Sequence, residues 1–255
     1  MIRAVLLDLA GVVYQGEQPL PGAVQAIASL RNAGFRLRFL TNTTRMPRRA
    51  LLSRLDGMGI AIADELFAPA QAACAWLAAK GLSAHLLIHP ALQEDFASLP
   101  ASGPEAVVIG DAADGFTYAA LNETFRKLLA GAAFLALACN RSFKDEDGEL
   151  SLDTGAFVTA LEYATQREAV LLGKPAPEFF NAALASIACD GKEAVMVGDD
   201  AEADVAGALA AGLGAALLVR TGKYRPGDES KAKPAPSETV ADLAAAARWI
   251  MERRA

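Results

Sequence analysis

Asp8 stands directly after a run of apolar residues, in the segment MIRAVLLDLAGVVY. A carboxylate at the end of a buried strand can attack phosphorus and form an aspartyl phosphate, which divides one difficult hydrolysis into two easier steps. A turn or helix-capping aspartate is the alternative interpretation, and it is the better one for Asp8 taken alone. The other polar segments of the chain decide between the two.

Groups that can donate hydrogen bonds to phosphoryl oxygens follow a second apolar run, at Thr41, Asn42 and Thr43. A hydroxyl, an amide and exposed backbone N–H groups all suit an anionic target. Further along, Lys174 lies in a Gly-Lys-Pro sequence just before a predicted helix. Its ammonium is a point charge that could hold both a phosphoryl group and the carboxylate of the nucleophile.

Carboxylates gather after another apolar run, at Asp199 and Asp200, with Asp204 close behind. Unpaired like charges would be costly at one strand end, whereas a hard cation that prefers oxygen ligands would stabilise them. Each of these polar segments is a weak signal alone. In this order, each after its own apolar run, they predict phosphoryl transfer assisted by a metal ion.

The elements that must position these residues are short apolar runs separated by helical patterns. Helical spacing covers 21–33, begins again at Pro47 and near Glu178, and closes the chain over 240–253. Near-continuous apolar strands that alternate with helices predict an α/β fold with a doubly wound parallel sheet, whose ligands bind at the carboxyl ends of the strands. The apolar runs are 3–9, 35–40, 84–89, 105–110, 133–139, 193–198 and 214–219.

The segment 82–167 repeats the strand and helix pattern but adds no comparable polar strand end apart from Gly110-Asp111. We therefore expect a core built from 1–81 and 168–255, with 82–167 inserted as an α/β cap domain. In this interpretation Asp111 lies in a turn of the cap. His85 and His89, at the two ends of one predicted strand, are too far apart to share a metal ion, and we expect surface or packing roles for them.

Composition excludes several classes of protein. The 255 residues are 53% hydrophobic and 21% charged, with a net charge of -6, which favours a folded globular chain. Lys and Arg are scattered, which argues against a nucleic-acid partner. No apolar segment reaches the ~20 residues that a membrane span needs. Cys74, Cys139 and Cys189 fit neither a disulfide framework nor a zinc site, so we expect buried thiols in a reducing, cytoplasmic compartment.

These motifs resemble those of the haloacid dehalogenase superfamily, whose four motifs match at Asp8, Thr41, Lys174 and the stretch 199–204. The long insertion implies the capped subgroup that includes the NagD-like and p-nitrophenyl-phosphatase-like enzymes. Within it, DLAGVVY, LTNTTR, TGAFVTALEYAT, GKPAPEFF and VGDDAEADVAGA look most similar to the branch of phospholysine phosphohistidine inorganic pyrophosphate phosphatases and their haloacid-dehalogenase-like relatives. The resemblance covers nearly the whole chain, and it implies a Rossmann-like core, a cap and a phosphohydrolase.

The resemblance also implies a metal and a nucleophile. Asp8 would be both the nucleophile and a ligand of Mg²⁺. The backbone carbonyl of Ala10 and the carboxylate of Asp199 would complete the protein's share of the coordination sphere. Asp200 and Asp204 would be supporting or alternative metal ligands, and the sequence leaves open which.

For the substrate, the resemblance implies that Thr41 and Asn42, with Thr43 beside them, would bind the phosphoryl group while Lys174 neutralises its charge. Arg45 could reach an anionic substrate, although an exposed arginine in a loop is equally ordinary. In the family, the counterparts of the cap segments 140–141 and 153–155 face the active site and set specificity. A cap that closes over the site would exclude water and select the leaving group.

Ala10 departs from the pattern of the family, since most of its phosphatases carry there a second Asp that acts as general acid and then as base. A methyl group cannot move a proton, so a contribution of ~10²- to 10⁴-fold is missing unless another group supplies it. One explanation is a substrate that needs little acid catalysis, such as a phosphoramidate, pyrophosphate or aryl ester. The alternatives are a weakly active or inactive protein that binds phosphorylated ligands, and an engineered substitution.

The sequence thus predicts a magnesium-dependent phosphohydrolase of the cytoplasm. Its substrate would be a small phosphorylated molecule: a phosphoramidate, pyrophosphate, or an aryl or sugar phosphate. We expect no nucleic-acid or membrane partner, and a homodimer is an assembly that the sequence leaves open. A binding or regulatory protein without turnover is the alternative, and Ala10 is its motivation.

Overall fold

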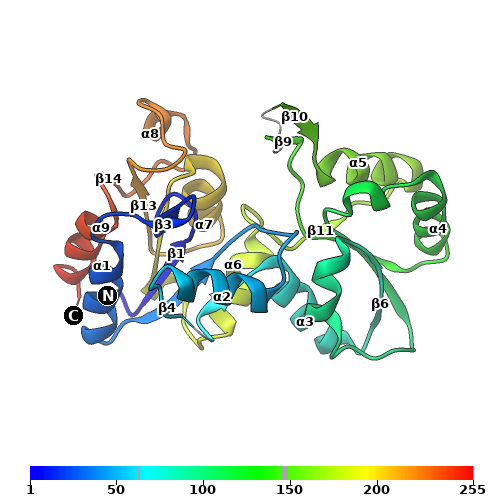
Figure 1. The fold of residues 1–255 in the computed structure, drawn as a ribbon, viewed down its shortest axis with the longest axis horizontal. Coiled ribbons are helices and arrows are strands. Elements are labelled where there is room, and N and C mark those ends of the chain that lie inside the picture. The colour runs from blue at the N-terminus through cyan, green and yellow to red at the C-terminus, as the bar shows by residue number, and fades with distance from the viewer. Residues whose placement is uncertain (63, 145–148, 255) are drawn as a thin grey trace. The chain divides into compact units, whose positions relative to one another are not determined.

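The computed structural model describes residues 1–62, 64–144 and 149–254. Contacts between backbone positions divide the chain into two units, each drawn with its own helices and strands in Figure 1. The first unit comprises Met1–Thr41, Arg49–Phe67 and Lys174–Ala255, and the second comprises Asn42–Arg48 and Ala68–Gly173. The expected α/β fold with parallel sheets is confirmed.

The first unit is built on a six-stranded sheet in the order β14-β13-β12-β1-β4-β5, and all of its strand pairs are parallel. Its central strands β1, β12 and β13 are buried along their whole length. This is why their sequences are continuous apolar runs rather than alternating ones. The strands are β1 Ala4–Asp8, β4 Arg36–Leu40, β5 Leu66–Phe67, β12 Ala194–Gly198, β13 Ala215–Val219 and β14 Glu238–Val240.

Helices cover both faces of this sheet. The crossover from β1 to β4 and the crossover from β12 to β13 run in opposite directions along the sheet, so right-handed connections place their helices on opposite faces. Helices α1 and α9 lie side by side (Figure 1). The remaining elements of the unit are α1 Ala23–Asn32, α2 Arg48–Gly57, α6 Pro177–Ala185, α7 Gly207–Ala210, α8 Asp228–Lys231, α9 Leu243–Met251, η3 Gly191–Glu193, the π-helix η4 Ala201–Ala206, and the hairpin strands β2 Tyr14–Gln15 and β3 Gln18–Pro19.

Large apolar side chains fill the core of the first unit. Leu6 and Phe39, from neighbouring strands, are fully buried. Phe179 and Phe180 of α6 are fully buried as well, and the ring centroid of Phe179 lies 5.5 Å from that of Phe67. The core therefore lies between the sheet and its helices, and it leaves the carboxyl ends of the strands for polar residues.

The second unit is built on a four-stranded parallel sheet in the order β11-β8-β7-β6. Helices α4 and α5 pack on it over a cluster that includes Val107, Ile109, Phe134 and Val158. Its elements are α3 Pro69–Lys80, β6 Ser83–Leu87, η1 Pro90–Phe96, β7 Glu105–Ile109, η2 Ala113–Gly115, α4 Tyr118–Leu129, β8 Ala133–Ala136, the antiparallel pair β9 Ser142–Lys144 and β10 Leu150–Leu152, α5 Thr154–Thr165 and β11 Val170–Leu171.

The second unit has wider bounds than the 82–167 expected from the sequence, since it begins at 68, ends at 173 and also includes 42–48. Asp95 explains the difference at the N-terminal side. Its backbone oxygen accepts a hydrogen bond from the Cys74 thiol of α3 at 3.3 Å, and its carboxylate accepts from the backbone N–H of Arg48 at 3.0 Å. These contacts join α3 and the loop 42–48 to the same unit.

The expectation of buried cysteines is wrong. Cys139 is exposed, and Cys74 and Cys189 are partly exposed. Cys139 lies beyond the end of β8, and Cys189 follows the end of α6, where its thiol donates to the backbone oxygen of Asp190. Cys139 and Cys189 therefore lie outside helices and strands, whereas Cys74 lies within α3 on a partly exposed face, where its thiol donates to the backbone oxygen of Asp95.

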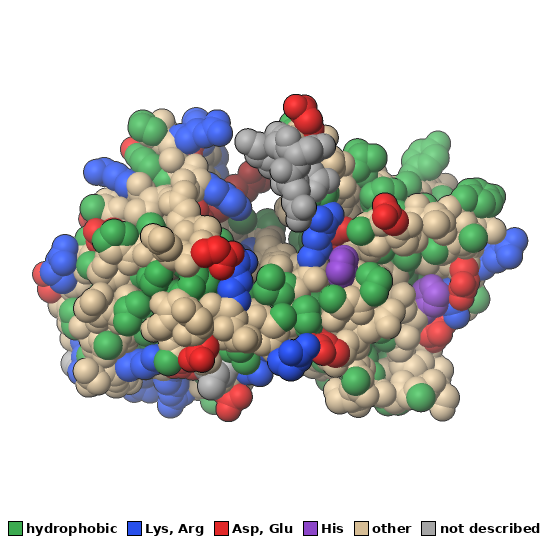
Figure 2. Space-filling view, in the orientation of Figure 1, with side chains coloured by type: hydrophobic (Ala, Val, Ile, Leu, Met, Phe, Trp, Pro, Cys, Tyr) green, Lys and Arg blue, Asp and Glu red, His purple; other side chains and the backbone are tan. Residues whose placement is uncertain are grey.

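Two observations concern nucleic acids and membranes as partners. On the face drawn in Figure 2, Lys and Arg side chains are interspersed with acidic and hydrophobic ones and form no continuous basic stripe. Among residues 1–62, 64–144 and 149–254, no helix is long and apolar enough to cross a bilayer.

The central strand β1 should dominate the stability of the first unit. We expect Leu6→Ala to lower the free energy of unfolding by about 2–5 kcal/mol, because Leu6 is fully buried and the cavity cannot collapse between neighbouring strands. Urea denaturation measures the loss. The same substitution at Leu129, which is 60% exposed, should change it by less than about 1 kcal/mol. Equal losses at the two positions would contradict this account of the core.

Candidate active site

The sheet of the first unit brings Asp8, Thr41 and Asp199 to one edge. Strand β1 lies between β12 and β4, and its last residue, Asp8, pairs in register with Leu40. Asp199 directly follows β12, and Thr41 directly follows β4. Because parallel strands end at the same edge of a sheet, three segments distant in the sequence converge there.

Four buried charged side chains meet at this edge. One carboxylate oxygen from each of Asp8, Asp199 and Asp204 lies within 4.8 Å of the others. The ammonium of Lys174 donates hydrogen bonds to Asp8 Oδ1 and to Asp204 Oδ1, the latter at 2.6 Å. The four residues are at most 8% exposed, so water screens their charges little.

Burial and neighbouring charges shift the pKa values of the groups in this cluster. Burial raises the pKa of Asp8 to about 7, against the attraction of Lys174 and with a further rise from the neighbouring Asp204. Burial also raises the pKa of Asp199 to about 6, although the backbone N–H of Lys223 opposes it. Burial would lower the pKa of Lys174, but the attraction of Asp204 and Asp8 outweighs it and raises that pKa. Lys174 is therefore an ammonium at neutral pH.

These residues fit a divalent metal ion. Three buried carboxylates converge within reach of one ion, while a single ammonium balances only part of their charge. Oxygen atoms from carboxylates are the ligands that hard cations such as Mg²⁺ prefer. Burial, with a smaller contribution from the neighbouring Asp204, raises the pKa values of Asp8 and Asp199, and a bound cation would favour the charged form of both carboxylates.

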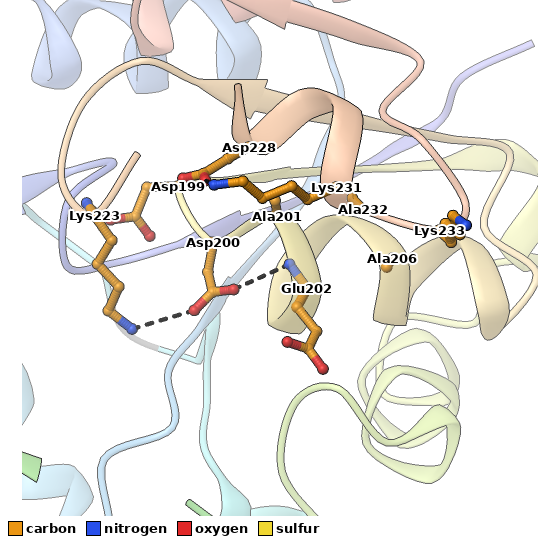
Figure 3. Close-up of a pocket in the computed structure, with 10 residues that line it drawn as sticks. All are labelled: Asp199, Asp200, Ala201, Glu202, Ala206, Lys223, Asp228, Lys231, Ala232 and Lys233. Carbon is orange, nitrogen blue, oxygen red and sulfur yellow. Dashed lines mark hydrogen bonds and ion pairs between the residues drawn. The ribbon is translucent and has the colours of Figure 1, made fainter. Parts of the chain in front are cut away.

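The structure separates the roles of Asp200 and Asp204, which the sequence left open. Asp204 belongs to the π-helix η4 and points its carboxylate into the cluster, where Oδ2 also accepts from the backbone N–H of Asp200 at 3.1 Å. Asp200 caps η4 instead: its Oδ1 accepts from the N–H groups of Glu202 and Ala203. Its other oxygen lies 3.5 Å from the ammonium of Lys223 (Figure 3).

A pocket of about 520 Å³ adjoins Asp199 on the side of α8 and η4 (Figure 3). Its lining mixes charges of both signs, and Lys231 is paired with Asp228 at 2.9 Å. The lining residues are Asp199, Asp200, Ala201, Glu202, Ala206, Lys223, Asp228, Lys231, Ala232 and Lys233. This mixture of charges singles out no ligand.

Ala10 lies in the turn that follows β1. Backbone N–H groups of Val13 and Tyr14 donate to the carbonyl of Leu9, and the N–H of Gly11 donates to the carbonyl of Tyr14. None of these bonds uses the carbonyl of Ala10. The side chain of Ala10 is a methyl group, which has no proton to transfer. Ala10 is exposed, so there is space for a longer side chain at this position.

The loop 42–48, with Asn42, Thr43 and Arg45, belongs to the second unit, whereas Thr41 is a buried residue of the first. Within the second unit, Arg45 forms an ion pair with Asp111, and its guanidinium lies 4.3 Å from the centroid of the Phe143 ring. Asp111 thus lies in a turn after β7, as expected, and it also anchors the loop.

Other residues noted in the sequence have structural partners within the second unit. His85 is partly buried 3.3 Å from the Thr124 hydroxyl, and His89 caps η1. Asp153 caps α5, and the N–H of Gly155 donates to the carbonyl of Asn140. Neither histidine joins a metal-binding cluster among the described residues.

Three comparisons with known proteins agree with the geometry. A family model described as haloacid dehalogenase-like hydrolase matches residues 5–99, and a model described as HAD-hydrolase-like matches 171–246. The phospholysine phosphohistidine inorganic pyrophosphate phosphatase of Rattus norvegicus is 40% identical over 98% of this chain and 95% of its own.

Two solved structures share the fold. NagD from E. coli K-12 aligns with a TM-score of 0.84 at 23% identity, over 95% of this chain and 97% of its own. The glycerol phosphate phosphatase of Mycobacterium tuberculosis, solved in complex with magnesium, aligns with a TM-score of 0.80 at 30% identity, over 95% of this chain and 75% of its own.

Metal binding should stabilise the protein, and more so at higher pH. Because Asp8 and Asp199 have raised pKa values, the folded metal-free protein binds more protons than the unfolded chain between about pH 4 and 7, and stability falls as pH rises through this window. A divalent ion must displace those protons. At a free concentration of 100 times its dissociation constant, the ion should add about 2.7 kcal/mol to the free energy of unfolding. The ion concentration that gives this gain should be lower at pH 8 than at pH 5.5.

Thermal unfolding with Mg²⁺ and with chelator, at both pH values, measures this effect. The variant Asp199→Asn should lose most of the metal-dependent rise in Tm, since a buried ligand is removed. Asp56→Asn, which removes an exposed carboxylate of α2, is the matched control and should keep it. A rise that is independent of pH, or that survives in Asp199→Asn, would rule out this cluster as the metal site.

Proposed function

This chain belongs to the haloacid dehalogenase-like hydrolases and is a phosphatase, and from that premise we propose that it hydrolyses a small phosphorylated molecule through an aspartyl phosphate on Asp8, with magnesium as its metal. One observation carries the proposal: the buried ammonium of Lys174 joins Asp8 to Asp204 beside Asp199. No structural role of the fold requires three carboxylates and a lysine to be desolvated together.

In the first step, an oxygen of the Asp8 carboxylate attacks phosphorus while the bond from phosphorus to the leaving group breaks. The product is an acyl phosphate on Asp8. In the second step, water attacks that phosphorus, inorganic phosphate departs and the carboxylate is restored. Lys174 holds Asp8 through Oδ1, which orients the carboxylate, and its positive charge offsets the charge of the phosphoryl oxygens.

Thr41 is the proposed donor of the first unit to the phosphoryl oxygens, because it is buried and follows the strand beside β1. Asn42 and Thr43 follow it in sequence and carry the further donors that such oxygens accept. Arg45 is proposed to hold the loop through Asp111 and Phe143, since both contacts engage its guanidinium.

When bound, a divalent ion would shield the nucleophile from its anionic target and stabilise charge in the transition state. Asp8, Asp199 and the carbonyl of Ala10 are the proposed ligands, with Asp204 as a support held by Lys174. Asp200 is proposed to act indirectly, as the cap of η4. The second unit is proposed to be the cap that excludes water and contacts the leaving group.

Ala10 restricts the substrates that this site can serve. Without a proton donor at position 10, leaving groups of low basicity or with a proton already in place should be favoured. Phosphoramidates, pyrophosphate and aryl phosphates meet that condition. The alternative of a binding protein without turnover is not favoured, since relatives matched over nearly the whole of this chain include proteins named as phosphatases. We also propose a cytoplasmic location, because the three cysteines are unpaired thiols.

Phosphate release tests the nucleophile. We expect Mg²⁺-dependent release from a phosphoramidate, from pyrophosphate or from an aryl phosphate, and Asp8→Asn should reduce it to the background level because an amide cannot form the acyl phosphate. Acid quenching followed by mass spectrometry should locate a phosphoryl group on Asp8 in the unaltered protein. Asp56→Asn is the matched control. Activity that persists in Asp8→Asn would reject the proposed nucleophile.

Restoring a carboxylate at position 10 tests the account of the leaving group. We expect Ala10→Asp to raise the rate for an alkyl phosphate by ~10²- to 10⁴-fold, because a general acid would protonate its poor leaving group. The rate for an aryl phosphate, which needs little protonation, should change much less. The ratio of the two kcat/KM values measures the effect. An equal change for both substrates would mean that Ala10 does not set this preference.

A further inference from the structure

Asp199 is enclosed by two glycine turns that the proposed mechanism has not used. Gly11 lies in the turn after β1, and Gly222 lies in the turn after β13. Strand β12, which ends just before Asp199, lies between β1 and β13 in the sheet. The turns after both neighbouring strands therefore meet over one carboxylate.

The approach of the two turns leaves no room for a side chain. A Cβ at Gly222 would lie 1.9 Å from Asp199 Oδ2 and 2.6 Å from the Cα of Gly11. A Cβ at Gly11 would lie 2.0 Å from the same oxygen. Both glycines also have positive φ, +86° at Gly11 and +63° at Gly222, where other residues are strained.

Hydrogen bonds hold this arrangement. The backbone N–H of Lys223 donates to Asp199 Oδ2 at 2.7 Å, and the hydroxyl of Thr221 donates to the carbonyl of Gly11. The ammonium of Lys223 lies 3.5 Å from Asp200 Oδ2 (Figure 3). The turn 221–223 thus contacts Asp199, the turn after the nucleophile, and the cap of η4.

We infer that the turn Thr221-Gly222-Lys223 is the positioning element of the metal ligand Asp199. The turn engages Oδ2 through the backbone N–H of Lys223 and packs Gly222 against it, which fixes the orientation of the Asp199 carboxylate. Thr221 keeps the turn in register with the loop that carries Ala10. This role rests on the proposed function, in which Asp199 is a ligand of the metal ion. Partners that orient metal ligands in this way typically change metal affinity by 10–100-fold when they are lost.

Gly222→Ala tests the inference. The added methyl must displace the Asp199 carboxylate, so Mg²⁺ affinity, measured by calorimetric titration of the full chain, should fall by about 10–100-fold. Gly16→Ala is the matched control, because Gly16 has nearly the same φ, +60°, but nothing lies within 4 Å of its added Cβ. The Gly16→Ala variant also places an alanine at positive φ, and it should keep the Mg²⁺ affinity of the unaltered protein.

A second pair of variants applies if Gly222→Ala fails to fold. Thr221→Val keeps the shape of the side chain but loses the hydrogen bond to Gly11, so it should weaken Mg²⁺ binding, and Thr221→Ser should restore it. Unchanged Mg²⁺ affinity in Gly222→Ala, or in Thr221→Val where Gly222→Ala does not fold, would overturn the inference while leaving the proposed function intact. An unaltered protein that binds no Mg²⁺ would overturn both.

Discussion

Three carboxylates and one ammonium are buried together at the carboxyl edge of the main sheet, and the remaining features of the site follow from this imbalance. At an effective dielectric constant of about 20, two like charges 4 Å apart repel by about 4 kcal/mol. Lys174 relieves part of this repulsion, and burial together with the remaining repulsion from Asp204 raises the pKa values of Asp8 and Asp199. Burying three carboxylates with one ammonium costs free energy unless a cation balances the remaining negative charge. The cluster therefore indicates a divalent-metal site.

The strand order of the sheet brings Asp8, Thr41 and Asp199 to this site. Placing β1 between β12 and β4 sets the proposed nucleophile Asp8 beside the proposed metal ligand Asp199 on one side and beside Thr41 on the other. Ala10 then separates two tasks that many phosphatases of this kind combine. The charged residues of the first unit can stabilise charge, but position 10 offers no donor for the proton that a poor leaving group needs. In the proposed function, substrate choice consequently depends on the basicity of the leaving group.

The loop 42–48, which carries the proposed phosphate-binding residues Asn42 and Thr43, is held within the second unit. The carboxylate of Asp95 accepts a hydrogen bond from the backbone N–H of Arg48, and Asp111 pairs with Arg45, so two carboxylates of that unit hold the loop at its middle and at its C-terminal end. Asn42 and Thr43 lie between Thr41 and these anchors. Of the proposed donors to the phosphoryl group, Thr41 belongs to the first unit, whereas Asn42 and Thr43 belong to the second.

The sequence by itself determined the parallel α/β fold and the identity of the strand-end residues Asp8, Thr41 and Asp199, because a buried parallel strand must be a continuous apolar run and its polar neighbours must lie at the end. It could not choose between Asp200 and Asp204, since the π-helix η4 decides which carboxylate turns inward. It likewise missed Gly222 and misplaced the cysteines. Those features depend on contacts between segments far apart in the chain, which no local pattern encodes; only the packing of β13 and β1 beside β12 brings Gly222 and Gly11 to the same oxygen.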